Sequence, residues 1–160
     1  MMGARPTEAT AERDIERLFA SESPRMWRSI VGYTGDPDIA SDAVAEAFTL
    51  ALERSQDIAS PAGWLWRVAF RIATAELKRR RQERGDVPDQ AYLVDDRATE
   101  VVAALRRLSP RQRGAIVLRY YADRPIEDVA RILGSTPAAV RVHLMRARRR
   151  LRELLEADDG

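Results

Sequence analysis

The sequence predicts an all-α fold of two small helical domains joined by an acidic linker. Six of its eight prolines stand where helices begin, and five of those follow a residue whose side chain can cap a helix N-terminus. No window shows the sustained alternation of apolar and polar residues that a strand requires. The prolines in question are Pro24, Pro37, Pro61, Pro110, Pro125 and Pro137.

These start signals divide the chain into eight expected helices. They are predicted at 10–21, 24–34, 37–54, 61–83, 98–108, 110–121, 125–133 and 137–156. Residues 85–97 contain glycine, proline and four aspartates without an apolar stripe, and are therefore expected to be a linker. The predicted organisation is a tail at 1–13, a domain at 14–84, the linker at 85–97 and a domain at 98–157.

The composition excludes several classes of protein. A chain with 45% hydrophobic and 32% charged residues is typical of a water-soluble domain, and no stretch approaches a membrane span, so no membrane insertion is expected. The absence of cysteine excludes disulfides and thiolate chemistry, and the first residues lack the apolar core of a secretory signal. A cytoplasmic location is expected, with no cofactor and no metal.

Positive charge is concentrated in two blocks, although the net charge is only +2. Residues 64–84 hold seven basic side chains against two acidic ones, and residues 141–152 hold six arginines and no acid. Each block falls on a predicted helix, so the chain would present two cationic surfaces suited to a polyanion.

The first block lies on an amphipathic helix. At 100° per residue, Trp66 falls beside the apolar face, whereas Trp64, Arg67, Arg71 and Lys78 share the opposite face. An exposed tryptophan among guanidinium groups can stack on an unpaired base while the cations neutralise phosphates. Two simpler interpretations remain: Trp64 could cover the preceding loop, and the terminal cations could simply stabilise the negative end of the helix.

The second block belongs to a predicted helix-turn-helix. Ala130, Gly134 and Val140 have the offsets of a small residue at the helix crossing, a turn glycine and an apolar residue that anchors the second helix. Arg141, His143 and Arg146 could then reach base edges, and the cations of 148–152 could bind phosphates. His143 is the only histidine, and neither a metal nor a catalytic role is expected of it.

In this order, the segments resemble bacterial RNA polymerase sigma factors of the ECF (extracytoplasmic function) group. The resemblance rests on DPDIASDAVAEAF at 36–48, WLWRVA at 64–69, LRRLSPRQR at 105–113, VLRYY at 117–121 and the helix-turn-helix. It implies that 14–84 is a region 2-like domain, which binds core RNA polymerase and the promoter −10 element. It also implies that 98–157 is a region 4-like domain, which binds the −35 element.

The resemblance also implies roles for individual residues, and the loop 54–59 would capture a flipped −10 base. The implied polymerase contacts are Asp42, Glu46 and Phe48. The implied −10 contacts are Trp64, Arg67, Arg71, Lys78, Arg79 and Arg80. The implied −35 contacts are Arg141, His143, Arg146, Arg149 and Arg150. Promoter DNA and core RNA polymerase are the expected partners, and an anti-sigma factor is a further one.

The sequence departs from the family at three positions of the first half, and also at Ala139, Val142 and His143 of the predicted recognition helix. Ala45, Arg71 and Ala75 stand where the family usually has glutamine, asparagine and aspartate. They support an alternative, in which the chain is a sigma-like DNA-binding regulator without efficient polymerase binding or promoter melting. An enzyme is not expected, because the chain has no cysteine, no phosphate-binding glycine loop and no histidine paired with a carboxylate at helical spacing.

Overall fold

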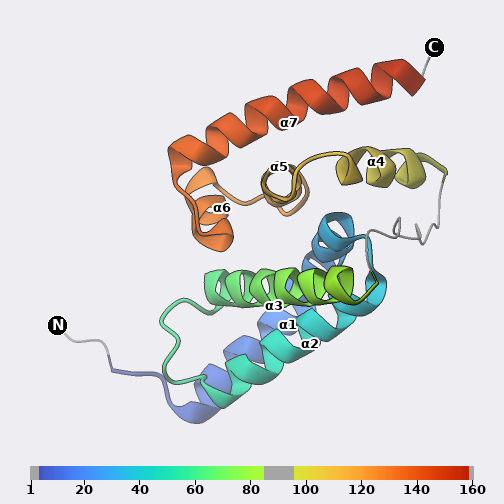
Figure 1. The fold of residues 1–160 in the computed structure, drawn as a ribbon. Coiled ribbons are helices and arrows are strands. Elements are labelled where there is room, and N and C mark those ends of the chain that lie inside the picture. The colour runs from blue at the N-terminus through green and yellow to red at the C-terminus, as the bar shows by residue number, and fades with distance from the viewer. Residues whose placement is uncertain (1–3, 85–95, 159–160) are drawn as a thin grey trace.

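The computed structural model describes residues 4–84 and 96–158, and that part of the chain is helical without strands (Figure 1). This confirms the predicted all-α class. The elements are α1 (Glu8–Thr34), α2 (Pro37–Glu53), α3 (Pro61–Arg84), α4 (Asp96–Arg106), α5 (Pro110–Ile116), the π-helix η1 (Val117–Tyr121), α6 (Ile126–Leu133) and α7 (Pro137–Asp158).

Four of the six predicted helix starts are confirmed at their prolines, and three of them, at Pro37, Pro110 and Pro137, have a side-chain cap. The carboxylate of Asp36 accepts hydrogen bonds from the amides of Asp38 and Ile39, at 2.9 and 3.3 Å, directly before Pro37. The Ser109 hydroxyl accepts one from the Gln112 amide at 3.2 Å. These bonds satisfy N–H groups that have no partner within the helix.

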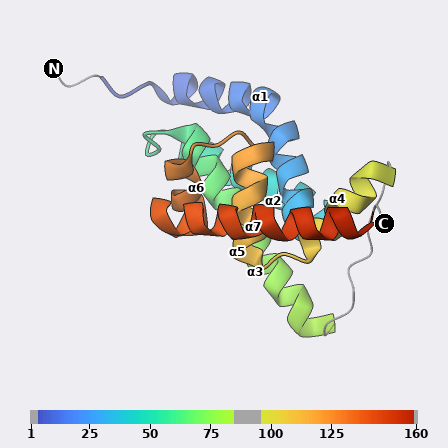
Figure 2. The same ribbon diagram turned by 90° about the horizontal axis from the view of Figure 1, so that it is seen from above.

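Pro24 does not begin a helix, so the expectation of separate helices at 10–21 and 24–34 is wrong. It lies inside the single helix α1, which changes direction along its length (Figure 2). Proline removes one backbone hydrogen bond and bends a helix, but it does not end the helix when packing holds both sides. Ile15 before it and Met26 and Ile30 after it are all buried in the core.

The helix expected at 110–121 changes type half-way. From Val117 the chain forms a π-turn, in which the amide of Ala122 donates to the carbonyl of Val117 at 3.0 Å. Val117 and Leu118 are buried there, whereas Tyr120 and Tyr121 are exposed. Pro125 was expected to be the first residue of a helix. It instead occupies the N-cap position of α6, which begins at Ile126.

Residues 85–95, most of the predicted linker, lie outside the described residues. The structure places the end of the predicted linker in a helix, since α4 begins at Asp96. This helix ends at Arg106, two residues earlier than the sequence suggested.

The two halves of the chain share one hydrophobic core. Figure 1 shows α1, α2 and α3 as one group and α4 to α7 as another, with α6 beside α3. Buried side chains from both groups form a continuous cluster, which includes Trp66 and Phe70 of α3 together with Leu118 and Val129 of the second half. The halves are therefore packed against each other.

We predict that Gly35→Ala destabilises the chain by at least about 1 kcal/mol, because Gly35 ends α1 in the left-handed region with φ 73°. A β-carbon there would also meet the Arg106 guanidinium. Thermal unfolding of the two chains measures the difference. Gly63→Ala is the matched control, since no atom lies within 4 Å of the added carbon, and it is expected to cause no loss of stability. Equal melting of both variants would contradict the prediction.

Candidate nucleic-acid interface

The cationic face of α3 is present as predicted. Trp66 is fully buried, whereas Arg67, Arg71 and Lys78 are exposed. The difference follows from helical phasing, because the apolar side of α3 packs against α1 and α2 and turns the opposite side outward. Trp64 is half-buried and packs against the core, so its ring is less exposed than the sequence indicated.

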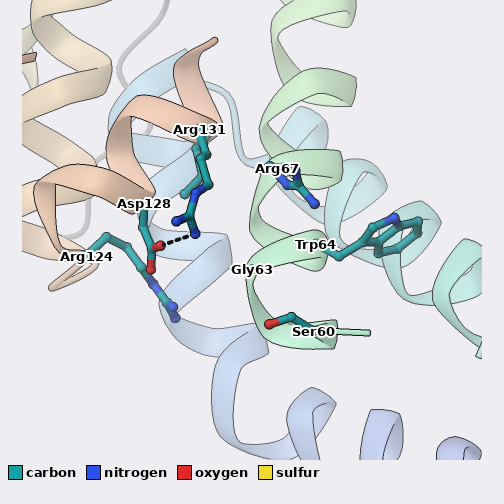
Figure 3. A pocket seen from close by; sticks show the side chains of 8 residues that line it. Ser60, Gly63, Trp64, Arg67, Arg124, Asp128 and Arg131 are labelled. Atoms are coloured by element: carbon teal, nitrogen blue, oxygen red, sulfur yellow. Dashed lines mark hydrogen bonds and ion pairs between the residues drawn. The ribbon is translucent and has the colours of Figure 1, made fainter. Parts of the chain in front are cut away.

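The cationic face lies opposite the second half of the chain. A cavity of about 280 Å³ separates Trp64 and Arg67 from Arg124, Asp128 and Arg131 (Figure 3). In that view the Trp64 ring points away from the three residues of the second half. A larger cavity of about 560 Å³ continues along α3. Its lining includes the cations Arg71, Lys78, Arg111 and Arg131.

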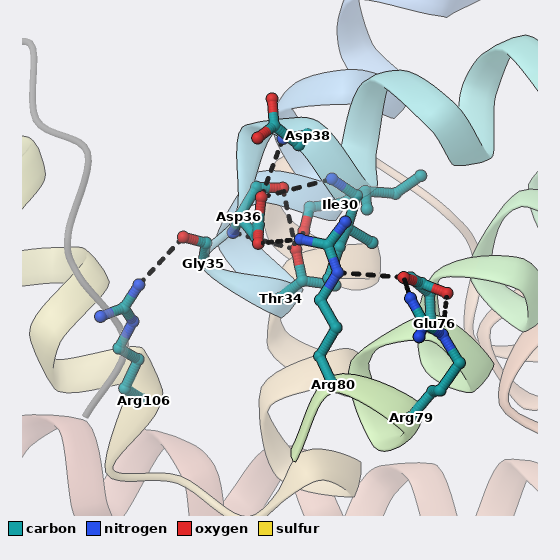
Figure 4. Close-up of polar contacts among 10 residues, drawn as sticks. Ile30, Thr34, Gly35, Asp36, Asp38, Glu76, Arg79, Arg80 and Arg106 are labelled. Atoms are coloured by element: carbon teal, nitrogen blue, oxygen red, sulfur yellow. Dashed lines mark hydrogen bonds and ion pairs between the residues drawn. The ribbon is translucent and has the colours of Figure 1, made fainter. Parts of the chain in front are cut away.

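At the C-terminal end of α3, two of the predicted −10 contacts are held in ion pairs (Figure 4). Arg79 donates to Glu76 and to Glu83, the latter at 2.7 Å. Arg80 donates to Glu76 at 3.0 Å and to Asp36 at 2.6 Å. Asp36 also caps α2, so Arg80 connects the end of α3 to the beginning of α2.

These pairs change the acidity of Glu76. The hydrogen bonds from Arg79, and after them those from Arg80, lower the pKa of the Glu76 carboxyl from 4.5 to about 2. The same pairing raises the pKa of the Arg79 guanidinium. Both arginines therefore have carboxylate partners in this state. Arg67, Arg71 and Lys78 have no such pair among residues 4–84 and 96–158.

The helix-turn-helix is formed as predicted by α6, a tight turn and α7. Gly134 ends α6 with φ 63°, and its amide reaches the carbonyls of Ala130 and Arg131. Ala130 is buried where the helices meet, and Val140 is buried at the start of α7. The Thr136 hydroxyl accepts from the Ala139 amide at 3.2 Å, which caps the first turn of α7.

The outer face of α7 is strongly cationic. Leu144 and Ala147 continue the buried stripe below Val140, and the arginines project from the remaining sides. The exposed predicted contacts are Arg141, Arg146, Arg149 and Arg150. His143 is half-buried. Arg150 lies 3.4 Å from Glu153 in a pair open to water, which holds it only weakly.

Tyr120 is not among the contacts predicted from the sequence. In the structure its hydroxyl accepts a hydrogen bond from Arg148 of α7, whose guanidinium lies 5.8 Å from the Tyr120 ring centroid. Tyr120 belongs to η1 and is 54% exposed. The only sequence signal was the adjacent pair Tyr120-Tyr121 on a helix whose apolar stripe was already complete.

A separate surface on α1 and α2 carries the predicted polymerase contacts. Asp42 and Glu46 are exposed on α2, but Phe48 is only 5% exposed and supports the core. The ring of Phe19 packs edge-on against Phe48 with centroids 5.1 Å apart, and Phe19 is itself 51% exposed. Of these two rings, Phe19 is therefore the one exposed on this surface, and exposed Leu52 follows one turn beyond Phe48 along α2.

The described ranges give no sign of a metal centre or a membrane segment. Across 4–84 and 96–158, no three metal-ligating side chains gather in one place. None of the helices in those ranges combines the length and apolar character that a membrane crossing requires.

Comparison with known proteins identifies the second half first. Residues 98–151 match the family described as Sigma-70, region 4. The RNA polymerase sigma-E factor of Streptomyces antibioticus is 29% identical over 157 residues, which cover 91% of this chain and 87% of that protein. The RNA polymerase sigma factor SigV of Bacillus subtilis is 25% identical, over 84% of this chain and 86% of its own length. Residues 98–151 thus have the sequence of a sigma region 4 domain, and nearly the whole chain is similar to RNA polymerase sigma factors.

Two solved structures of sigma factors share the fold of this chain. The sigma factor RpoE from Bartonella quintana, solved in complex with the anti-sigma factor NepR, superposes with a TM-score of 0.78 at 23% identity, covering 91% of this chain and 99% of that one. CnrH, solved in complex with the cytosolic domain of CnrY, superposes with a TM-score of 0.75, also at 23% identity, covering 94% and 96%. At this identity the likeness concerns the arrangement of helices.

We predict that Glu76 stays ionised at pH 3 in the folded chain, because its pKa of about 2 lies below the ordinary 4.5. The stability from its ion pairs is then complete above pH 4.5 and is lost as the pH falls through about 2. The carboxyl carbon shift of Glu76 across pH 2–5 measures this. Arg79→Ala should raise the pKa, whereas Glu83→Gln should leave it low. A wild-type midpoint near 4.5 would disprove the assignment.

Proposed function

We propose that this chain joins core RNA polymerase and directs it to promoters that have a −10 and a −35 element. The observation that carries the proposal is the pairing of two cationic helical faces, on α3 and α7, in a chain whose relation to sigma factors extends over both. On this proposal the chain acts as an initiation factor in the cytoplasm, uses no cofactor and is not itself an enzyme. Residues 14–84 would be its region 2-like domain and 98–157 its region 4-like domain.

The −35 element would be bound by α7. A helix that projects from a helix-turn-helix fits the major groove when its N-terminal side chains are small, as Ala138 and Ala139 are. Arg141 and Arg146 are exposed beyond them, and an arginine can donate two hydrogen bonds to the edge of a guanine. The exposed Arg149 and Arg150 would bind phosphates, which adds affinity that falls with salt and does not depend on sequence.

The −10 element would be bound by α3 and the loop at 54–59. Opening a promoter requires unpaired bases to be held away from the duplex, by stacking and by neutralising the phosphates. Arg67, Arg71 and Lys78 are exposed and supply the charge, and the half-buried Trp64 offers only part of its ring. Arg79 and Arg80 would contribute after exchanging their carboxylate partners for phosphates, since both pairs are accessible to water.

Core polymerase would bind at the α1–α2 surface. Exposed Asp42 and Glu46 provide negative charge beside the exposed apolar side chains of Phe19 and Leu52. A mixed apolar and charged surface is the usual composition of a protein interface. An anti-sigma factor is a further proposed partner, because one solved structure that shares the fold contains the anti-sigma factor NepR, and another contains the cytosolic domain of CnrY.

The alternative of a sigma-like regulator is supported by two exposed positions. Ala45 on α2 and Ala75 on α3 are exposed and offer no hydrogen bond to polymerase or DNA. A regulator of this kind would bind duplex DNA through α7 and would not start transcription.

Run-off transcription separates the two functions. Bacterial core RNA polymerase is supplied with the chain and with genomic fragments as template, and the 5′ ends of the transcripts are mapped. A sigma factor gives defined start sites that core polymerase alone does not give. A Glu46→Arg chain is the control, because it reverses a charge at the proposed polymerase contact and leaves α7 unchanged. Duplex binding without defined starts would favour the regulator.

We predict that Arg146→Ala lowers affinity for the −35 duplex by about 1–3 kcal/mol and relaxes the sequence preference. Titration of labelled duplexes of the selected and of random sequence measures both effects. Arg149→Ala is the matched control on the same helix and is expected to weaken both duplexes equally, as loss of a phosphate contact does. If Arg146→Ala also weakens both equally, it does not read bases.

A further inference from the structure

We propose that Tyr120 of η1 and Arg148 of α7 together bind one phosphate of the DNA backbone, on the strand opposite to the one that Arg150 meets. We call these two side chains the tyrosine-arginine pair. The inference rests on the proposed function, because it adds a contact to the duplex that α7 would bind. It also makes η1 part of the DNA-binding surface, although none of the −35 contacts predicted from the sequence lies on η1.

The two side chains of the pair hold each other in place. Arg148 donates a hydrogen bond from Nη1 to the Tyr120 hydroxyl, and its guanidinium carbon lies 5.8 Å from the Tyr120 ring centroid. The residues are 28 positions apart and belong to different helices. A hydrogen bond and a ring contact together restrict a long side chain that would otherwise sample many rotamers. The guanidinium is therefore positioned before any ligand binds.

The pair is exposed and keeps its positive charge. Tyr120 is 54% exposed, and Arg148 is exposed as well. Contacts of this kind add little to the stability of a fold, because water competes for both partners. Within residues 4–84 and 96–158, no carboxylate pairs with Arg148. Since its partner is a neutral phenol, the guanidinium charge is not compensated and can attract an anion.

The pair also has hydrogen-bond donors left for that anion. A phenol hydroxyl can accept one hydrogen bond and donate another, and a guanidinium has five N–H groups. The Tyr120 oxygen accepts from Arg148, and no acceptor for its own hydrogen is seen in the described part of the chain. Hydroxyl and guanidinium donors at adjacent atoms suit the two non-bridging oxygens of a phosphodiester. Such a contact is independent of the base sequence.

Helical phase places the pair on one flank of α7. Two residues along a helix correspond to a rotation of about 200°, so Arg146 and Arg150 project on the side away from Arg148. Arg141 and Arg152 are seven positions before and four positions after Arg148, and they share its flank. All five of these arginines are exposed. The cations of α7 therefore form two rows, and Tyr120 extends one of them.

The two rows would meet different strands of the duplex. The major groove is about 12 Å wide and a helix with its side chains is about 10–12 Å across, so a helix in the groove lies between two phosphate backbones. Side chains on its two flanks then meet phosphates of opposite strands. Tyr120 stands outside α7, on η1, and so extends the flank of Arg148 away from the groove axis.

Duplex binding at several salt concentrations tests the pair. Tyr120→Phe removes only the hydroxyl and is expected to weaken selected and random duplexes alike, by about three- to tenfold. Its salt dependence should not change, because no charge is lost, whereas Arg148→Ala should lower the slope of log affinity against log salt by about 0.9. An unchanged slope for Arg148→Ala would overturn the proposal.

Tyr121→Phe is the matched control for Tyr120→Phe. Tyr121 is also 54% exposed and is adjacent in the chain, but in the described ranges no arginine contacts its ring or its hydroxyl. This variant is expected to bind both duplexes as tightly as the wild-type chain. Equal affinities of Tyr120→Phe and Tyr121→Phe would overturn the proposal.

A scan of single phosphates locates the contact. Each selected duplex carries one methylphosphonate, which replaces a charged oxygen by a methyl group. One position should weaken binding of the wild-type chain but have a smaller effect on both Tyr120→Phe and Arg148→Ala. Arg150→Ala is expected to identify a phosphate of the other strand. If Tyr120→Phe and Arg148→Ala identify different phosphates, or the strand that Arg150→Ala identifies, the proposal is wrong.

The double variant tests whether both side chains act on one phosphate. Its loss of affinity for random duplex is expected to be smaller than the product of the two single losses, because either substitution already disrupts the shared contact. A loss equal to that product would mean independent contacts and would overturn the pair. Thermal melting is measured for each variant, and Arg148→Lys, which keeps the charge without the planar donors, replaces Arg148→Ala if that variant unfolds.

The outcomes separate this proposal from the proposed function. Phosphate contacts act on random duplexes too, so Tyr120→Phe and Tyr121→Phe can be compared even if the chain selects no sequence. In that case the −35 function fails, and the comparison still decides whether the pair binds phosphate. Unchanged duplex affinity with weaker binding to core polymerase would assign the pair to a protein interface, which would overturn the phosphate site and leave the proposed function standing.

Discussion

Burial of Trp66 is the constraint on which the rest of the arrangement depends. The side chain is fully buried, with its ring stacked against Phe70 at 6.2 Å and its N–H bonded to Glu22. Because a helix turns 100° per residue, placing Trp66 inward fixes the direction of every other side chain on α3. Arg67, Arg71 and Lys78 are outside for this reason. The same ring is the surface on which Arg124 rests, so the rotation of α3 and the position of the second half are set together.

The arginines of this chain divide into two kinds that a count of charges cannot separate. Arg113 and Arg124 are buried or nearly so against aromatic rings of the first half, where their stems and planar guanidinium groups provide packing as well as charge. The arginines of α7 project from the surface of the helix and remain hydrated. Only some of the basic side chains are therefore accessible to a ligand such as nucleic acid. The exposed arginines of α7 are accessible, whereas Arg113 and Arg124 are not.

Local features of the fold were predictable and distant ones were not. The starts at Pro37, Pro61, Pro110 and Pro137 depend on a ring and its neighbours, which the sequence shows directly. Whether Pro24 ends a helix depends instead on packing on both sides of it. The inward Trp66 followed from helical phase within one element. Phase could not decide between Phe19 and Phe48, because that choice depends on how two helices approach each other.

The same limit applies to charge. Arg79 and Arg80 lie three and four residues after Glu76, a spacing at which side chains on a helix meet, so this pairing was predictable from the sequence. The bond from Arg80 to Asp36 spans 44 positions and was not. The contact between Glu22 and Arg124 spans 102 positions and has no local signal in the sequence.

This contact has one residue in each half of the chain, which matters when halves of two related proteins are joined. A chimera that keeps one half and takes the other from a relative would inherit the promoter preference of each part, but only one side of this contact. Such a hybrid would lack the ion pair between Glu22 and Arg124, so we expect its two halves to pack against each other less stably.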